Sequence, residues 1–204
     1  MTELTSPALT TLAITDAVLC ATCLYGACRQ TLPYGARLAC ALLALAAMLG
    51  VLHFSGLYPL PSLHSFASML GGMVSLPLLA IGVAAPHSLV ASTKHFAWTL
   101  AVVLGVLGLL IITLGGFRIV TDAVAALCVL TMLVAAYRQR SRAGLVAACV
   151  LLLTLVAVLL KWQIPSASSV QNVPLLQTTD LLHLGLAAGI FAFVQFYFFK
   201  GDEA

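Results

Sequence analysis

Charged residues are scarce in this chain. Only 7% of its 204 residues are charged, whereas 62% are hydrophobic, and the mean hydropathy is +1.13. A soluble domain carries about a quarter charged residues. This deficit excludes a disordered chain and a disulfide-stapled secreted module, and nothing resembles the lysine-rich stripe that grips nucleic acid. The composition therefore predicts an integral membrane protein without a nucleic-acid partner.

Long apolar windows give the expected number of membrane crossings. A helix needs about 20 mostly apolar residues to span the hydrocarbon core. Seven such windows occur, over Leu9–Cys28, Leu38–Tyr58, Ser65–Ala85, His95–Leu114, Phe117–Tyr137, Ala143–Trp162 and Thr178–Phe199. They predict an all-α, seven-helix bundle that forms one domain over residues 1–204. The first window lacks a basic leader and contains Asp16, so we do not expect a cleaved signal sequence.

The basic residues predict the orientation of the bundle, because short cytoplasmic loops collect Lys and Arg. Most of the nine follow the first, third, fifth and seventh windows: Arg29, Arg37, Lys94, Arg138, Arg140, Arg142 and Lys200. Only Arg118 and Lys161 lie on the other side. We expect the N-terminus outside and the C-terminus in the cytoplasm, in the plasma membrane, with a bacterial inner membrane as the setting.

Two sulfur pairs have spacings that occur in redox or metal motifs. Cys20 and Cys23 lie one turn apart on an apolar helix, and no second cysteine pair accompanies them. Met69 and Met73 are four residues apart, where a copper site would need more sulfurs. Buried cysteine behaves as a small hydrophobe, so we interpret both pairs as packing residues.

Three acidic residues lie inside predicted membrane helices. A charged side chain there costs a few kcal/mol at least, usually faces the bundle interior and marks a site. With a rise of about 1.5 Å per residue, Asp16 lies about 10–12 Å below the outer boundary, Asp122 about 8–9 Å and Asp180 about 3–5 Å. All three therefore lie in the outer half of the bilayer.

Three histidines fall in the same leaflet. His53 is near the outer end of the second window and His64 at the outer start of the third. His183 follows Asp180 by three residues, so the two share one helical face. His87 and His95 lie on the cytoplasmic side. Three carboxylates and three imidazoles thus converge on one region, where Arg118 is expected at the rim.

These residue types suit a metal-dependent reaction. Catalytic zinc takes three protein ligands from His, Asp or Glu and one water. His53, His183 and either Asp180 or His64 could supply the three ligands. Asp16 or Asp122 could orient them or act as the base toward the metal-bound water. The sequence therefore predicts a zinc site that hydrolyses an amide or ester of a membrane lipid.

The arrangement resembles the alkaline ceramidase and adiponectin-receptor superfamily of seven-helix membrane hydrolases. His53 matches its second-helix ligand and His183 one of its seventh-helix ligands. The resemblance implies a zinc site and a lipid amide substrate. This chain has Leu49 where the superfamily has Ser, no Asp in the third window, and Asp180-Leu-Leu-His183 in place of His-x-x-x-His. The early Thr15-Asp16 and late Asp-x-x-His also resemble uncharacterised small bacterial seven-helix proteins.

Other classes remain open. Intramembrane Asp and His also form proton relays and cation sites in transporters, and a non-enzymatic subunit could bind a lipid or another helix. Association of several copies is open as well. A cytochrome could clamp haem between His53 and His183, although the nearby carboxylates make that pocket very polar. A retinal protein needs a lysine in the last helix, and Thr178–Phe199 contains none.

Overall fold

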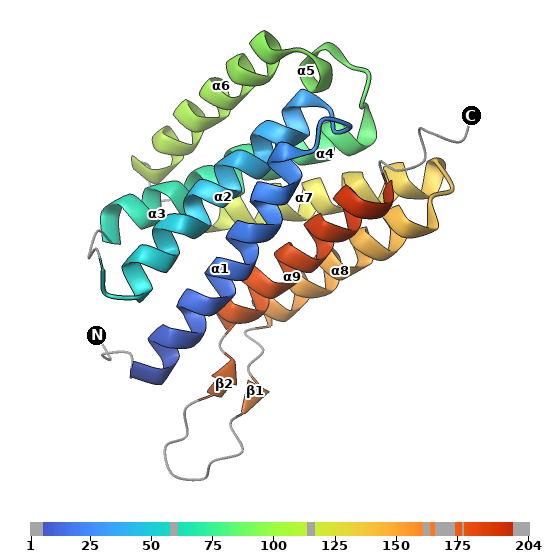
Figure 1. Cartoon of the computed structure of the whole chain (residues 1–204). Coiled ribbons are helices and arrows are strands. Elements are labelled where there is room, and N and C mark those ends of the chain that lie inside the picture. Colours follow the sequence, from blue (N-terminus) through green and yellow to red (C-terminus); the bar gives the residue numbers. More distant parts are fainter. Residues whose placement is uncertain are drawn as a thin grey trace.

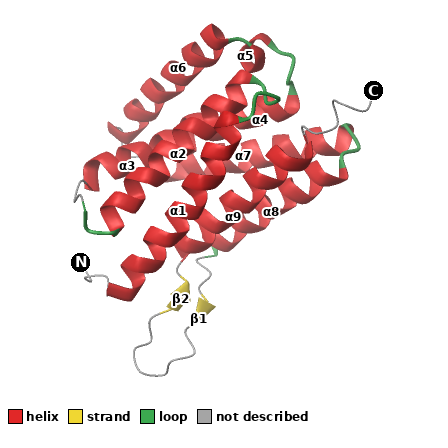
Figure 2. Cartoon of the chain, viewed as in Figure 1, coloured by secondary structure: helices red, strands yellow, loops and turns green. Residues whose placement is uncertain are grey.

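Helices placed side by side form nearly the whole described part of the chain (Figures 1 and 2). The computed structural model describes residues 6–57, 61–113, 117–160, 164–165, 174–176 and 178–197. The elements are α1 (Ser6–Cys28), α2 (Tyr34–Phe54), α3 (Pro61–Leu70), η1 (Gly71–Ser75), α4 (Leu76–Ala84), α5 (Leu89–Ser92), α6 (Lys94–Thr113), α7 (Phe117–Arg138), α8 (Arg142–Leu159), β1 (Ile164–Pro165), β2 (Pro174–Leu176), α9 (Thr178–Ala192) and η2 (Phe193–Tyr197). Elements η1 and η2 are π-helical turns.

The third membrane helix is continuous but contains a π-helical turn. Segments α3, η1 and α4 follow one another without a break. Gly71 and Gly72 are poor helix formers, and Pro77 in the first turn of α4 has no N–H to donate to the preceding turn. These residues weaken the regular hydrogen-bond ladder locally, which is where a π-helical turn can form.

The two ends of the bundle differ in character. Helices α1, α3, α7 and α9 begin at the end where strands β1 and β2 pair, with Ile164 opposite Leu176 (Figure 1). We call this the hairpin end. The other is the arginine end, defined by the described basic residues Arg29, Arg37, Lys94, Arg138, Arg140 and Arg142. The strand pair is a small addition to the predicted all-α fold.

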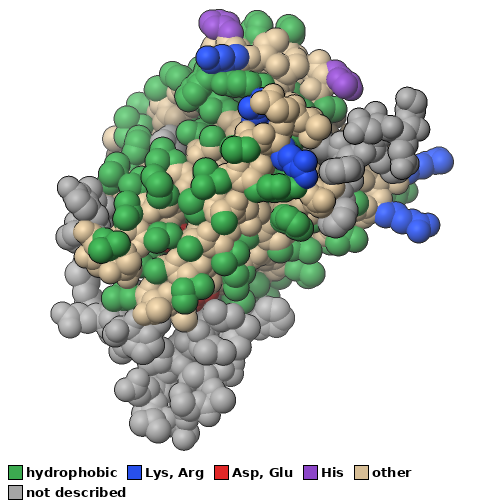
Figure 3. All heavy atoms as spheres, in the orientation of Figure 1, with side chains coloured by type: hydrophobic (Ala, Val, Ile, Leu, Met, Phe, Trp, Pro, Cys, Tyr) green, Lys and Arg blue, Asp and Glu red, His purple; other side chains and the backbone are tan. Residues whose placement is uncertain are grey.

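The flanks of the bundle match a hydrocarbon environment. Among the described residues, six helices are long and apolar enough to cross a membrane, and Thr179–Gln195 is a shorter apolar helix. Large side chains such as Val102 (60% exposed) and Leu127 (65%) cover the outside. Figure 3 shows this hydrophobic surface, with Lys and Arg toward the arginine end. The chain is therefore an all-α bundle suited to a membrane, as the sequence predicted.

Helix α2 begins earlier than its hydropathy suggested. The predicted window starts at Leu38, but α2 starts at Tyr34, directly after Pro33, and ends at Phe54 rather than Tyr58. Hydropathy excluded Arg37 from the helix. In the structure Arg37 Nε donates a hydrogen bond to the carbonyl of Ala27 at 3.1 Å, so a charged residue fits in the first turn.

Small residues let the helices approach closely, as expected where the hydrophobic effect does not drive helix association in lipid. A Cβ built on Gly189 of α9 would overlap Leu151 of α8. Cys23 of α1 and Cys40 of α2 are fully buried, and all six cysteines are free thiols. Met69 and Met73 are buried too, and Met73 packs against Gly108 of α6. These positions are consistent with packing.

Candidate functional site

Asp16 of α1 and His183 of α9 lie in contact with each other. The Nδ1 atom of His183 lies 3.0 Å from Oδ1 of Asp16. The carboxylate is 2% exposed and the imidazole 13%. The two atoms are at ion-pair distance but are not aligned as a hydrogen bond. Because Nδ1 faces the carboxylate, Nε2 is the nitrogen left to act on a ligand.

A second polar contact ties the same two helices together. The hydroxyl of Thr15 lies 3.1 Å from Oδ1 of Asp180, and Asp180 is completely buried. The same hydroxyl is 3.1 Å from the carbonyl of Leu12, so its single proton is shared between two acceptors. Thr15 and Asp16 are adjacent on α1, and they contact Asp180 and His183 respectively. These two partners lie one turn apart on α9.

Gly50 makes room for the carboxylate of Asp16. A Cβ at Gly50 of α2 would overlap Asp16 Oδ2, approach Asp16 Cγ to 2.7 Å and reach His64 Cε1 at 3.0 Å. The absent side chain thus lets a carboxylate and an imidazole lie against the backbone of α2. Asp16 Oδ2 is buried and has no hydrogen-bond partner among the described residues. Such an atom is costly in a protein interior, and it is available to a donor on a ligand.

His53 and His64 lie beside this pair. Their rings stack at a centroid separation of 5.6 Å and an angle of 18°. Phe54 closes the group, with its ring 5.2 Å from that of His64. Within the described chain, the Nδ1 atoms of both histidines are buried and unpartnered. Through these two histidines, the C-terminal end of α2 and the first turn of α3 border the site.

A cavity of about 230 Å³ joins these groups to an apolar interior. Its polar lining comes from α1, α3, α7, α8 and α9 and consists of Asp16, His64, Ser68, Thr121, Asp122, Thr154 and His183. The rest of its wall is mainly aliphatic and includes Leu19, Leu43 and Leu186. The cavity therefore has the chemical profile of an amphiphile, with a polar end and an apolar body.

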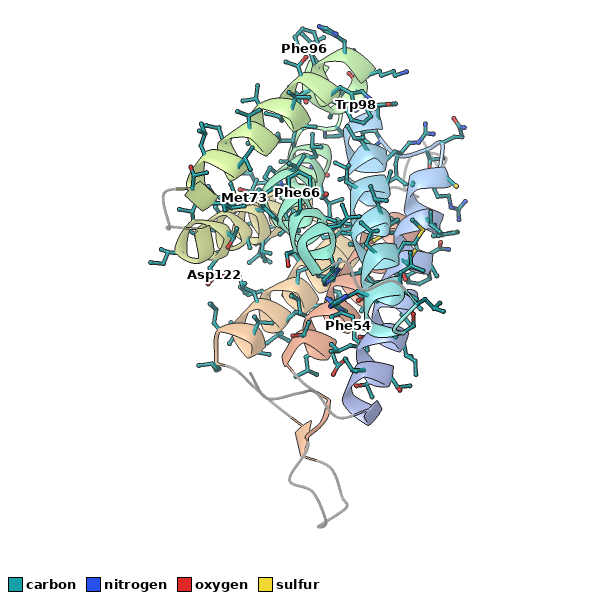
Figure 4. All side chains as sticks on the ribbon, turned by 90° about the vertical axis from the view of Figure 1, so that its left-hand side faces the viewer. Phe54, Phe66, Met73, Phe96, Trp98 and Asp122 are labelled. Carbon is teal, nitrogen blue, oxygen red and sulfur yellow. The ribbon has the colours of Figure 1, made fainter. Side chains whose placement is uncertain are left out.

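Asp122 reaches the cavity from α7, whereas the other acids belong to α1 and α9. It is half-buried and is labelled in Figure 4. The side chain of Arg118, expected at the rim, lies outside the described residues. Asp180 and His53 do not line the cavity. The predicted cluster thus comes together, but its members divide between the cavity wall and the packing behind it.

The predicted zinc ligands have different neighbours in the structure. Asp180 contacts Thr15, His183 pairs with Asp16, and His53 stacks on His64. In the described part of the chain, no three His, Cys, Asp or Glu side chains are grouped as metal ligands. The observed donor geometry therefore does not fit a three-ligand metal centre, and zinc binding stays a prediction.

Sequence reasoning missed the residues that shape the site rather than carry its charge. Gly50 is one turn before His53 and reads as an ordinary small packing residue in an apolar helix. Thr154 of α8 likewise looks like one more helix residue. Ser75 is fully buried, its hydroxyl has no hydrogen-bond partner in the part of the chain that the structure describes, and it ends the π-helical turn η1. The Gly71-Gly72 pair followed by Pro77 was the one available signal of the turn.

These observations define an integral-membrane helical bundle with a buried Asp–His pair. The chain belongs to a family of unknown function (DUF6962), which it matches over residues 11–196. That range includes every residue that lines the cavity. No curated protein and no solved structure matches the chain.

Proposed function

We propose that this protein is a membrane-embedded hydrolase that acts on an ester or amide of a lipid or related amphiphile. The observation that carries the proposal is the Asp16–His183 pair at the polar end of an otherwise aliphatic cavity. A carboxylate that holds one imidazole nitrogen leaves the other as a general base, which is a recurring arrangement in hydrolases. The apolar wall provides the binding surface for an acyl or alkyl chain.

The reaction needs one water and one proton acceptor. His183 Nε2 takes a proton from water, and the oxygen forms a bond to the carbonyl carbon of the ligand. The bond from that carbon to the alcohol oxygen or amine nitrogen then breaks. The proton on His183 passes to the departing group, so the products are a carboxylic acid and an alcohol or amine. Asp16 stabilises the imidazolium between these steps.

Hydroxyl groups along the wall can act on the carbonyl oxygen. Negative charge develops on this oxygen as water adds, and nearby O–H donors stabilise it. Ser68, Thr121 and Thr154 line the cavity from three different helices. No step in this account passes through a metal ion, because the described side chains do not form a three-ligand group.

The proposed topology has seven spans, with α9 and η2 as the seventh, and the hairpin end outside the cytoplasm. The arginine end then faces the cytoplasm, an orientation that the distribution of basic residues supports. Exposed Cys28 at the end of α1 should react with an impermeant thiol reagent only from the cytoplasmic side. Ser55→Cys, just beyond α2, should react only from outside. Reaction of both from one side would contradict the seven-span arrangement.

Hydrolysis by purified protein tests the proposed function. The probes are p-nitrophenyl esters of short and long fatty acids and a fluorogenic long-chain amide, presented in detergent micelles. We expect hydrolysis of at least one probe, and its loss in Asp16→Asn and His183→Ala. His95→Ala serves as the control, because His95 is at the arginine end. Wild-type protein that hydrolyses none of the probes, or variants as active as wild type, would contradict the proposal.

A proton or cation relay uses the same residue types, and the tie from Thr15 to Asp180 is the observation that favours it. A relay predicts that proteoliposomes acidify or alkalise when an ion gradient is applied, without any ester or amide being cleaved. Measuring internal pH in the same proteoliposomes that are tested for hydrolysis separates the two functions.

A further inference from the structure

A second hollow lies beside the cavity, between α3 and α7. It has a volume of about 380 Å³ and is lined by His64, Ser65, Ser68, Met69, Gly72 and Thr121. Four of these residues, His64, Ser68, Gly72 and Thr121, also line the main cavity. The two hollows are therefore adjacent and share these residues, which we call the junction.

The π-helical turn explains why the helices part at this place. Helix α7 packs closely on α4 and contacts η1, but it hardly contacts α3. The α4 and η1 parts of the third membrane helix thus pack against α7. The α3 part, at the hairpin end, diverges from α7. A Cβ built on Gly72 would meet nothing within 4 Å, so the turn itself borders open space. Figure 4 looks onto this side, with Phe66 and Met73 on the third helix and Asp122 on α7.

Exposed apolar side chains occur on the helices around this hollow. Phe66 on α3 is 44% exposed, Leu110 on α6 53% and Ile119 on α7 79%. These side chains belong to segments long and apolar enough to cross a membrane. A molecule that enters here therefore comes from the lipid phase and must itself be soluble in lipid.

The hollow nevertheless has hydroxyl groups in its otherwise largely apolar lining. Ser65 and Ser68 are exposed and lie three residues apart on one face of α3, and Thr121 lines the hollow from α7. A polar head that leaves the interface for the cavity needs hydrogen-bonding groups along its path, because an unpaired polar group in hydrocarbon is costly. Hydroxyls provide these bonds without the cost of a buried charge.

We propose that an amphiphile with a single alkyl chain and an uncharged, hydrogen-bonding head enters the cavity sideways from the bilayer, between α3 and α7. This inference rests on the proposed function in one respect, that the cavity holds a lipid-like molecule. The head passes Ser65, Ser68 and Thr121 to reach His183, and the chain occupies the aliphatic wall. Side access explains how a ligand insoluble in water reaches a buried Asp–His pair.

Photochemical capture tests the proposal. Full-length protein in phosphatidylcholine vesicles is irradiated with a long-chain fatty alcohol that carries a diazirine in its alkyl chain, and the labelled peptides are identified by mass spectrometry. Leu19 and Leu43 are the diagnostic positions, because both line the cavity and are only 4% and 5% exposed. We expect labels at these positions in the wild type.

Two variants fill the junction from different elements. Ser68→Trp does so from α3 and Gly72→Leu from η1, and both should lose the labels at Leu19 and Leu43 while Phe66 remains labelled. Two junction variants are used because one of them could fail to fold. Phe66→Trp is the matched control, since it adds bulk on the outer surface of the same helix and should keep the internal labels. Internal labels that persist in both folded junction variants, or disappear equally in Phe66→Trp, overturn the proposal.

The capture experiment tests the side opening and the hydrolysis assay tests the proposed function, so either result can be negative without the other. Asp16→Asn should abolish hydrolysis and retain the internal labels, since the cavity stays open. A wild type that takes up the alcohol but cleaves no ester or amide would contradict the proposed function and leave the side opening standing. A wild type that cleaves a short, water-soluble ester but shows no label at Leu19 or Leu43 would contradict the side opening alone.

Discussion

Gly50 of α2 lies directly against the carboxylate of Asp16 of α1, so that any side chain larger than hydrogen at position 50 would overlap Asp16 Oδ2. This contact places the acid where Oδ1 is 3.0 Å from His183 Nδ1. The geometry of the catalytic pair we propose is therefore set in part by a residue that has no functional group.

Gly50→Ala should disturb the site directly. The added methyl group must displace Asp16 or separate α1 from α2, and overpacking of this kind costs about 1–3 kcal/mol. We expect a lower unfolding midpoint in detergent and reduced hydrolysis. Gly108→Ala is the matched control, because its Cβ would make only ordinary contact with Met73, at 3.5 Å, and Gly108 does not line the cavity. Equal behaviour of the two alanine variants would show that Gly50 does not position Asp16.

Thr15→Val should weaken the attachment of α9 to α1. Valine has nearly the shape of threonine but cannot donate a hydrogen bond to buried Asp180. Hydrogen bonds between membrane helices contribute about 0.6–2 kcal/mol, so a loss of that size is expected in the free energy of unfolding. Thr15→Ser keeps the hydroxyl and should stay near wild type. If the valine and serine variants unfold alike in denaturant, the bond contributes nothing.

Gly189 and Leu151 should show strong coupling between α9 and α8. A Cβ at position 189 would overlap the side-chain end of Leu151. Gly189→Ala alone is expected to destabilise the protein by about 1–3 kcal/mol. Leu151→Ala removes the obstructing atoms, so the double variant should be more stable than the sum of the two single effects. If the effects of the two substitutions on the free energy of unfolding are additive, the two residues are not in contact.

The sequence supported the architecture better than the chemistry. Apolar windows and intramembrane acids are strong local signals, since hydrocarbon penalises charge, and they located Asp16, Asp122, Asp180, His53, His64 and His183 near the hairpin end. The partners of these residues depend on helix rotation and distance, which hydropathy does not encode. The expectation that Asp180 and His183 act together on one ligand came from their shared face. In the structure they contact Thr15 and Asp16 instead, because α1 packs along that face.

The hollow beside the cavity could not be read from the sequence for a related reason. Gly71-Gly72 and Pro77 weaken a helix, but whether it kinks, breaks or forms a π-helical turn is decided by its neighbours. Here α7 contacts α4 and η1 and leaves α3. The sequence shows Ser65 and Ser68 as hydroxyl residues near the acids and histidines, but not that they border a hollow between α3 and α7.

A double-mutant cycle on hydrolysis tests the Asp16–His183 pair most directly. It compares Asp16→Asn, His183→Ala and the two combined, each shown to be folded by its circular dichroism. Loss of a general base costs about 10²–10⁴-fold in rate. Residues that act as one unit are not additive. We therefore predict that the double variant is no slower than His183→Ala alone. Independent effects, in which the two rate losses multiply, would contradict a catalytic Asp16–His183 pair.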